Sequence, residues 1–282
     1  MIVRLIKSIA MATAVTVAVC GTLSAQITDG LDFSEIEQWR LRTDNILRFC
    51  QLESNPTAAV DSRVGEAIAQ RLLLNASFAV LGDNYGIGGE YAAQDIYVNL
   101  VNDCDIILGM GIGAGLYPPE FTTTRPYVGF AYVGVARAGS ISNLSEISEA
   151  ASIGGPVGSY GFTALTRYVA TLPSTRRPRL LPYGETNLML TRLRDETIDA
   201  MVIYGPVLAE RLKNSSAQDI ATFDLAPQAP ATVNIGGLML SDNTYLRTTV
   251  DAAIASMIAD GTIETIVADA GFANLPFSAG GY

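Results

Sequence analysis

Histidine is absent from the 282 residues, and cysteine occurs only three times. Without histidine, a Ser-His-Asp or Cys-His catalytic group is excluded, and so is a zinc site built on imidazole. The 28 acidic residues show no spacing typical of a paired-carboxylate hydrolase. Patterns for haem attachment or copper ligation are missing as well. The sequence therefore predicts a protein that is not an enzyme and that holds no metal ion and no cofactor.

Basic residues are few, with 18 Lys and Arg against 28 Asp and Glu and a formal net charge of −10. This balance lacks the Lys/Arg footprint through which proteins bind nucleic acids by releasing counterions. It opposes binding to anionic membrane surfaces for the same reason. We therefore expect no nucleic-acid partner.

The N-terminus has the pattern of a secretory signal peptide. Two basic residues precede an apolar run from Ile9 to Val19, and the small residues of Leu23-Ser24-Ala25 stand before Gln26. The apolar run is shorter than the roughly 20 residues needed to span a bilayer. We predict that residues 1–25 are a cleaved signal peptide, that the mature chain is periplasmic and does not insert into the membrane, and that residues 26–44 form an N-terminal arm.

Glycines gather where a buried strand is expected to end. The apolar run Ile106–Leu108 is followed by glycines at 109, 111, 113 and 115. A dinucleotide-binding loop would need a helix to open at the last glycine, and Pro118-Pro119 excludes the interior of such a helix. The stretch therefore predicts a loop that lines a cleft.

Strand and helix patterns alternate along the chain, which predicts parallel sheets flanked by helices. An early amphipathic helix is expected to begin near Asp61 or Ser62, either of which can cap it. A second set of elements begins after Arg137. In it, Gly158–Gly161 leads into a helix, and this corner is either an anion site at the helix N-terminus or an ordinary connecting turn.

The order of these parts resembles a type II periplasmic solute-binding protein, the two-lobed receptor fold of bacterial ABC importers. The resemblance covers about residues 45–272 and rests on LVNDCDIILGM, TTTRPYVGFAYVGV, IDAMVIYGP and TVDAAIASMIADGTIETIVADAG. It implies an α/β fold with two lobes, each a mostly parallel sheet flanked by helices. Residues 45–136 with 235–282 would form lobe 1, and residues 137–234 would form lobe 2. Ligands of that fold lie between the lobes, at the carboxyl ends of strands.

A narrower group is more similar still, the MxaJ, MoxJ and XoxJ proteins. The similarity rests on ILRFC, CDIILGM, TTTRPY and the Tyr-Gly-Pro at 204–206. It implies an accessory or assembly factor for a PQQ-dependent methanol dehydrogenase, with that periplasmic quinoprotein dehydrogenase as its partner. The alternative is the receptor of an ABC importer for a small anionic or polar solute. Amino-acid receptors typically carry an arginine that residues 111–120 lack, and an aspartate whose place Tyr204 takes, so an ordinary amino-acid receptor is not expected.

Candidate cleft residues are those that stand at or beside the carboxyl ends of predicted strands. We expect the following to face one another: Glu53, Met110, Gly111, Thr124, Arg125, Tyr127, Ser159, Tyr160 and Tyr204. Arg125 can hold an anion by bidentate hydrogen bonding to a carboxylate. The alternative is that Arg125 pairs with a local acid.

Cys50 and Cys104 support two opposed predictions. An oxidising compartment favours a disulfide between them. Strand geometry opposes it, because a four-residue offset between adjacent parallel strands separates the two residues by roughly 13 Å, and a bond needs Cα atoms within about 7 Å. Only a shifted register, or a Cys104 that folds back from the preceding helix, would allow the bond.

Overall fold

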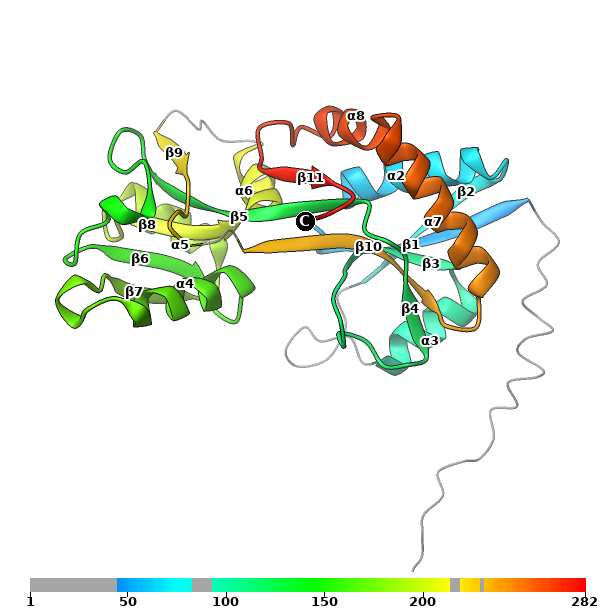
Figure 1. Ribbon diagram of the computed structural model, residues 1–282, viewed down its shortest axis with the longest axis horizontal. Coiled ribbons are helices and arrows are strands. Elements are labelled where there is room, and N and C mark those ends of the chain that lie inside the picture. The colour runs from blue at the N-terminus through cyan, green and yellow to red at the C-terminus, as the bar shows by residue number, and fades with distance from the viewer. Residues whose placement is uncertain (1–44, 83–92, 214–218, 229–230) are drawn as a thin grey trace, which may run out of the picture. The chain divides into compact units, whose positions relative to one another are not determined.

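The computed structural model describes residues 45–82, 93–213, 219–228 and 231–282 (Figure 1). The predicted signal peptide and the predicted arm lie outside these ranges. No helix in the described ranges has both the length and the apolar character needed to cross a membrane.

The first sheet begins as a parallel ladder in the order β2-β1-β3 and continues through the antiparallel strand β10 to β5. The short strands β4 and β11 pair with β10 and β5. Its strands are β1 (Ile46–Leu52), β2 (Asn75–Leu81), β3 (Ile106–Gly111), β4 (Phe121–Thr123), β5 (Val128–Arg137), β10 (Thr232–Leu240) and β11 (Phe277–Ala279).

The second sheet continues from β5 in the order β5-β8-β6-β7, with β9 also paired to β5. Its β6 is parallel to β7 and β8, whereas β5 is antiparallel to β8 and β9. The strands added here are β6 (Ser152–Pro156), β7 (Arg179–Tyr183), β8 (Ala200–Tyr204) and β9 (Ile220–Phe223).

Helices cover both faces of each sheet, as parallel connections require. They are α2 (Ala58–Arg71), α3 (Ala93–Asn102), α4 (Tyr160–Thr171), α5 (Thr186–Arg194), α6 (Gly205–Leu212), α7 (Thr244–Ala259) and α8 (Thr262–Asp269), with the 3₁₀ turns η1 (Leu144–Glu146) and η2 (Ser174–Arg176). Helix α7 contacts both α2 and α8, and the three lie together in Figure 1. The apolar residues Val250, Ile254 and Met257 recur at helical spacing along α7 and are buried here.

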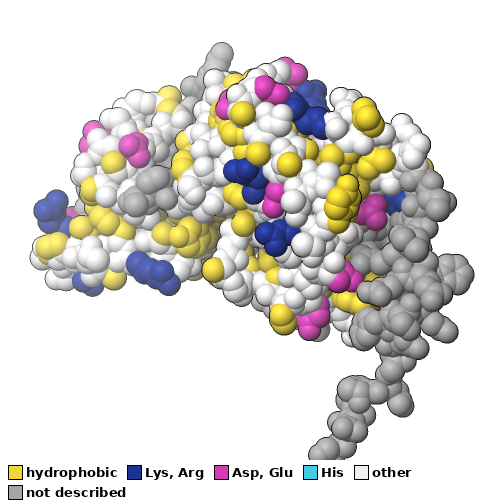
Figure 2. Space-filling model, turned by 45° about the vertical axis from the view of Figure 1, so that its right-hand side comes forward, with side chains coloured by type: hydrophobic (Ala, Val, Ile, Leu, Met, Phe, Trp, Pro, Cys, Tyr) yellow, Lys and Arg dark blue, Asp and Glu magenta, His cyan; other side chains and the backbone are white. Residues whose placement is uncertain are grey.

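Apolar side chains fill the space between sheets and helices. On the first sheet, Phe49 and Ile68 belong to the core under α2, α7 and α8, and Leu100 of α3 belongs to the core of the opposite face. On the second sheet, Met189 of α5 and Leu165 of α4 belong to separate cores. On the face shown in Figure 2, the Lys and Arg side chains are scattered between uncharged and apolar surface.

The strand β5 is shared by the two sheets. Residues Val128–Ala131 pair with β10 and β11, and residues Tyr132–Arg137 pair with β8 and β9. At this β5 junction (Ala131–Tyr132), the amide of Ala131 donates to the Pro276 carbonyl at 3.2 Å, and that of Tyr132 donates to the Ala231 carbonyl at 2.8 Å. The junction is thus held by Pro276 and Ala231, the residues directly before β11 and β10.

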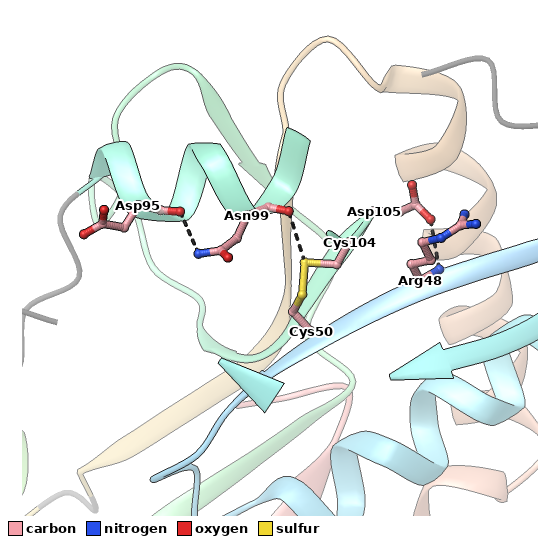
Figure 3. The surroundings of a disulfide bond; sticks show 6 residues. All are labelled: Arg48, Cys50, Asp95, Asn99, Cys104 and Asp105. Carbon is pink, nitrogen blue, oxygen red and sulfur yellow. Dashed lines mark hydrogen bonds between the residues drawn. A yellow bond between two sulfur atoms is a disulfide. The ribbon is translucent and has the colours of Figure 1, made fainter. Parts of the chain in front are cut away.

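Cys50 and Cys104 form a disulfide (Figure 3). Their Cα atoms are 5.7 Å apart, so the geometric estimate of roughly 13 Å was wrong. The register places Cys50 opposite Ile107, and the Cys104 amide donates to the Asn99 carbonyl at 3.0 Å. Cys104 therefore lies in the turn just after α3, held by this bond to the helix end, and its side chain reaches Cys50 of β1. Both cysteines are buried.

Candidate functional site

A buried carboxylate stands at the start of α2, where the sequence predicts only a helix cap. Asp61 is fully buried. The Tyr127 hydroxyl donates to its Oδ1 at 2.5 Å, and the Asn55 amide and the Thr57 hydroxyl donate to its Oδ2 at 2.6 and 2.8 Å. Asp61 takes part in none of the ion pairs found within the described ranges. The carboxylate is thus held by neutral donors alone.

Burial raises the pKa of Asp61 to about 6, and the hydrogen bonds from Tyr127, Asn55 and Thr57 oppose that rise. The network can hold both protonation states. The Thr57 hydroxyl lies 2.8 Å from Asn55 Oδ1 as well as 2.8 Å from Asp61 Oδ2. A protonated Asp61 can therefore donate to Thr57 while the Thr57 hydroxyl turns to Asn55.

Gly109, the first glycine of the series that follows the apolar run, makes room for this network. Its φ is +80°, and its amide donates to the Tyr127 hydroxyl at 3.0 Å. A Cβ at this position would lie 2.2 Å from Asn55 Nδ2 and 2.7 Å from Asp61 Oδ2. Both the backbone conformation and the close approach therefore require glycine.

Tyr204, at the end of β8, carries a hydroxyl with no partner. The oxygen is buried and forms no hydrogen bond with the residues described. The ring lies 5.3 Å from the ring of Tyr132 and 6.5 Å from that of Phe130. Burial raises the pKa of Tyr204, and the charges of Asp61 and Tyr132 add to the rise. The neutral hydroxyl is therefore a buried polar group without a hydrogen bond among the described residues.

The corner at Gly158–Gly161 begins α4 as predicted. The Ser159 hydroxyl accepts from the Phe162 amide at 3.2 Å and caps the helix. Tyr160 is 57% exposed. The side chain of Tyr132 lies against Gly161 at the same helix end, which brings β5 to this corner.

Three more predicted residues lie in or beside the sheet. The Thr124 hydroxyl is buried, donates to the Arg125 carbonyl at 2.8 Å and accepts from the Gly237 amide at 2.9 Å. Met110 is buried in the core with α3. The Gly111 carbonyl accepts from the Tyr117 hydroxyl at 2.9 Å. These contacts are structural, and a part in solute binding stays a prediction for all three residues.

Arg125 and Glu53 are exposed. The Arg125 amide donates to Asp251 Oδ1 of α7 at 2.7 Å, whereas the ion pair of Asp251 is with Arg247, at 3.7 Å. Arg125 therefore meets a local acid through its backbone. Its proposed role as an anion ligand stays a prediction.

The structure connects some of the predicted residues and leaves others apart. Tyr127 binds Asp61, whose charge also acts on Tyr204. The Tyr132 ring lies against Gly161, next to Ser159 and Tyr160 in the sequence, and contacts the ring of Tyr204. Sequence reasoning missed four residues of this group: Asn55, Thr57, Asp61 and Tyr132. The signal available for the first three was a polar run directly after the first predicted strand.

Two cavities lie in the second half of the chain, and one of them is lined by Tyr132 of this group. One, of about 330 Å³, is bordered by η1, α4 and Arg176. The other, of about 580 Å³, is bordered by β5, β9 and residues 273–276. Neither is lined by Asp61, Tyr127 or Tyr204.

Comparison with known proteins identifies the fold. No family model and no curated protein matches the sequence. Among solved structures, the second substrate-binding domain of Lactococcus lactis GlnP, in its open conformation, is 16% identical with a TM-score of 0.64, over 80% of this chain and 95% of that one. The unliganded, open L-cystine solute receptor of Neisseria gonorrhoeae is 16% identical with a TM-score of 0.60, over 87% and 99%. The predicted two-lobed α/β fold of type II solute-binding proteins is thus confirmed.

A third structure of this kind is the amino-acid ABC transporter substrate-binding protein AbpA from Streptococcus pneumoniae, bound to L-arginine. It is 15% identical with a TM-score of 0.54, over 86% of this chain and 99% of that one. All three are substrate-binding or solute-receptor proteins.

Proposed function

We propose that the chain is the solute-binding receptor of an ABC importer, that it works in the periplasm, and that it binds a small polar solute without altering it chemically. The observation that carries this proposal is the likeness to receptors over 95–99% of their own chains. The buried Tyr204 hydroxyl, without a partner in the described residues, supplies a polar group that a solute can satisfy.

The proposed solute site lies between two lobes. The predicted lobes are residues 45–136 with 235–282 and residues 137–234, although Tyr132–Arg137 pair with strands of the second sheet. Two observations support this division: β10 returns to pair with β3, and α7 contacts α2. The predicted cleft residues, Arg125 included, belong to this proposal.

The experiment is a screen of the secreted chain against amino acids, sugars and small organic acids, by thermal unfolding and then by calorimetric titration. A solute that binds only the folded chain raises the unfolding midpoint by mass action. Tyr204→Phe should weaken the binding about fivefold to tenfold, because one neutral hydrogen bond contributes roughly 1 kcal/mol. Tyr245→Phe is the matched control, since Tyr245 is 85% exposed on α7. If no solute binds saturably, the receptor proposal fails.

A second candidate function is the accessory role for a PQQ-dependent methanol dehydrogenase. One observation favours it: residues 111–120 lack arginine and Tyr204 stands in the aspartate position, so an amino-acid zwitterion finds no charge pair. The structural comparisons support the receptor more. Sedimentation of the chain with a purified PQQ-dependent methanol dehydrogenase tests the accessory role, and two independently sedimenting species would contradict it.

A further inference from the structure

The cavity of about 330 Å³ beside η1 is formed by residues between 144 and 178 alone. It borders the end of α4, a helix of 12 residues that begins at Tyr160. At 1.5 Å per residue, a helix of this length spans about 18 Å. The length of α4 therefore separates this cavity from the predicted cleft residues Ser159 and Tyr160.

Aliphatic side chains form the inner wall of this cavity. Leu144 and Val169 are buried in one core, and Ile147 packs against that core in a partly buried position. Leu172, the C-cap of α4, adds a fourth aliphatic side chain. Apolar walls with a few polar groups are typical of small-molecule sites, whose volumes run from about 300 to 1,000 Å³. The cavity thus suits a small ligand with an aliphatic part.

Arg176 supplies a positive charge at the rim. Its guanidinium forms no ion pair and no hydrogen bond among the described residues. The neighbouring Arg177 is engaged, because it donates to the carbonyls of Leu172 and Ala170, each at 2.8 Å. Arg177 therefore satisfies the carbonyls at the end of α4, and the charge of Arg176 is left to the cavity.

Glu149 supplies a negative charge at the same rim. The nearby Glu146 is engaged, since it accepts from the Ser142 amide at 2.8 Å and from the Asn143 side-chain amide at 2.6 Å. The carboxylate of Glu149, in contrast, has no ion pair and no hydrogen bond within the described part of the chain. Glu149 and Arg176 thus present opposite charges to one cavity without pairing with each other.

A free α-amino acid matches these three features. Its carboxylate can accept two hydrogen bonds from a guanidinium, and its ammonium group can donate to a carboxylate. An aliphatic side chain can then bury its apolar surface on the inner wall. The predicted cleft lacks such a charge pair, because residues 111–120 hold no arginine and Tyr204 takes the aspartate position.

We propose that this cavity is a further binding site, for a free α-amino acid with an aliphatic side chain, in which Arg176 binds the carboxylate and Glu149 binds the ammonium group. The proposal goes beyond the proposed receptor function and does not depend on it, because none of these residues belongs to the predicted cleft.

The test is an amide NMR titration of the secreted chain with three probes: L-leucine, leucinamide and 4-methylpentanoate. L-Leucine should shift the signals of Val169 and Leu172 saturably, with a Kd on the order of 1 mM or below. Leucinamide lacks the carboxylate, and 4-methylpentanoate lacks the ammonium group. At about pH 6.5, where the α-amino group is protonated, each should bind at least fivefold more weakly than L-leucine.

Two variants assign the charges. Arg176→Gln and Glu149→Gln should each weaken L-leucine at least fivefold, and Arg176→Gln should bring L-leucine to the level of leucinamide, which a merely structural role would not do. Arg167→Gln on α4 and Glu210→Gln on α6 are matched controls, because both residues are exposed and outside the cavity. They should stay within about twofold of the wild type, and thermal unfolding checks that each variant is folded. The proposal is overturned if neither signal shifts saturably, or if the three probes bind equally.

Tyr204→Phe separates this site from the receptor function. L-Leucine binding that is lost in Arg176→Gln and kept in Tyr204→Phe supports the site beside η1. Binding that is weakened in Tyr204→Phe and kept in Arg176→Gln would overturn this site and support the receptor proposal instead.

Discussion

The carboxyl group of Asp61 has a higher pKa in the folded chain than in the unfolded chain. Burial raises its pKa from 3.8 to about 6, so the folded state holds the proton more tightly than the unfolded state does. The stability that this provides is complete below the unfolded pKa and is lost as the pH rises through about 6. Over that window the free energy of unfolding should fall by about 3 kcal/mol on account of this group.

Urea unfolding of the wild type and of Asp61→Asn, between pH 4 and pH 7.5, checks this prediction. The amide cannot ionise, so the variant should lose the downward slope between pH 4 and pH 6 that the wild type shows. The comparison is of slopes, because the amide also changes the hydrogen bonds with Asn55 and Thr57 at every pH. Equal slopes in the two proteins would mean that Asp61 titrates as it does in the unfolded chain.

Tyr127→Phe should destabilise the chain more at pH 7.5 than at pH 5. The lost hydroxyl donates to Asp61 Oδ1, and a hydrogen bond to a charged acceptor contributes about 1.5–3 kcal/mol. The loss should be smaller where Asp61 is protonated. Tyr117→Phe is the control, because its hydroxyl donates to the neutral Gly111 carbonyl and its cost should not change between the two pH values. A Tyr127→Phe cost that is equal at both values would contradict the assignment.

At the scale of elements, a side chain fixes the entry into β5. The buried Thr124 hydroxyl binds the Gly237 amide of β10 and the Arg125 carbonyl. Thr124→Val keeps the shape and removes the hydroxyl, so the free energy of unfolding should fall by about 1–3 kcal/mol. Thr123→Val is a suitable comparison, because within the described ranges no hydrogen bond is seen for its hydroxyl. Chemical denaturation of both variants measures the difference, and similar costs would count against the role of the Gly237 contact.

The disulfide joins β1 to the end of α3 across 54 residues of sequence. Replacing both cysteines with alanine should cost about 4 kcal/mol in the chain-entropy account, in which the bond restricts the unfolded chain. Intact mass after alkylation without reductant checks the bond itself, and no alkyl group should be added to the secreted chain. Two added groups would show free thiols.

Elements with strong local patterns could be predicted from the sequence, whereas their registers could not. The apolar stripe of α7 follows from helical spacing alone. The disulfide could not be judged in this way, because the turn at Cys104 depends on the bond from its amide to the Asn99 carbonyl. A local pattern shows that β3 begins nearby, but it does not show that the chain folds back first.

At the scale of the whole molecule, the order of the elements predicted the fold, but the candidate site is built from distant segments. Asp61 and Tyr127 are 66 residues apart in sequence, and nothing local to either one indicates the other. The sequence predicts that the strand ends at Gly109, whereas β3 continues to Gly111. The empty Cβ position that Gly109 provides is required by Asn55 and Asp61. The sequence therefore showed which types of residue stand at the predicted strand ends. It did not show which residues they contact.

Hydrogen exchange at the β5 junction can measure local opening of this strand. Two adjacent amides, of Ala131 and Tyr132, donate to carbonyls at Pro276 and Ala231, where one strand passes from the first sheet to the second. We expect bending of β5 at this point to break these two bonds while the ladders on either side stay paired. Their hydrogen–deuterium exchange, compared with that of Phe130 and Val133, therefore measures how often the ligand-free chain opens at this point, a local free energy separate from that of global unfolding.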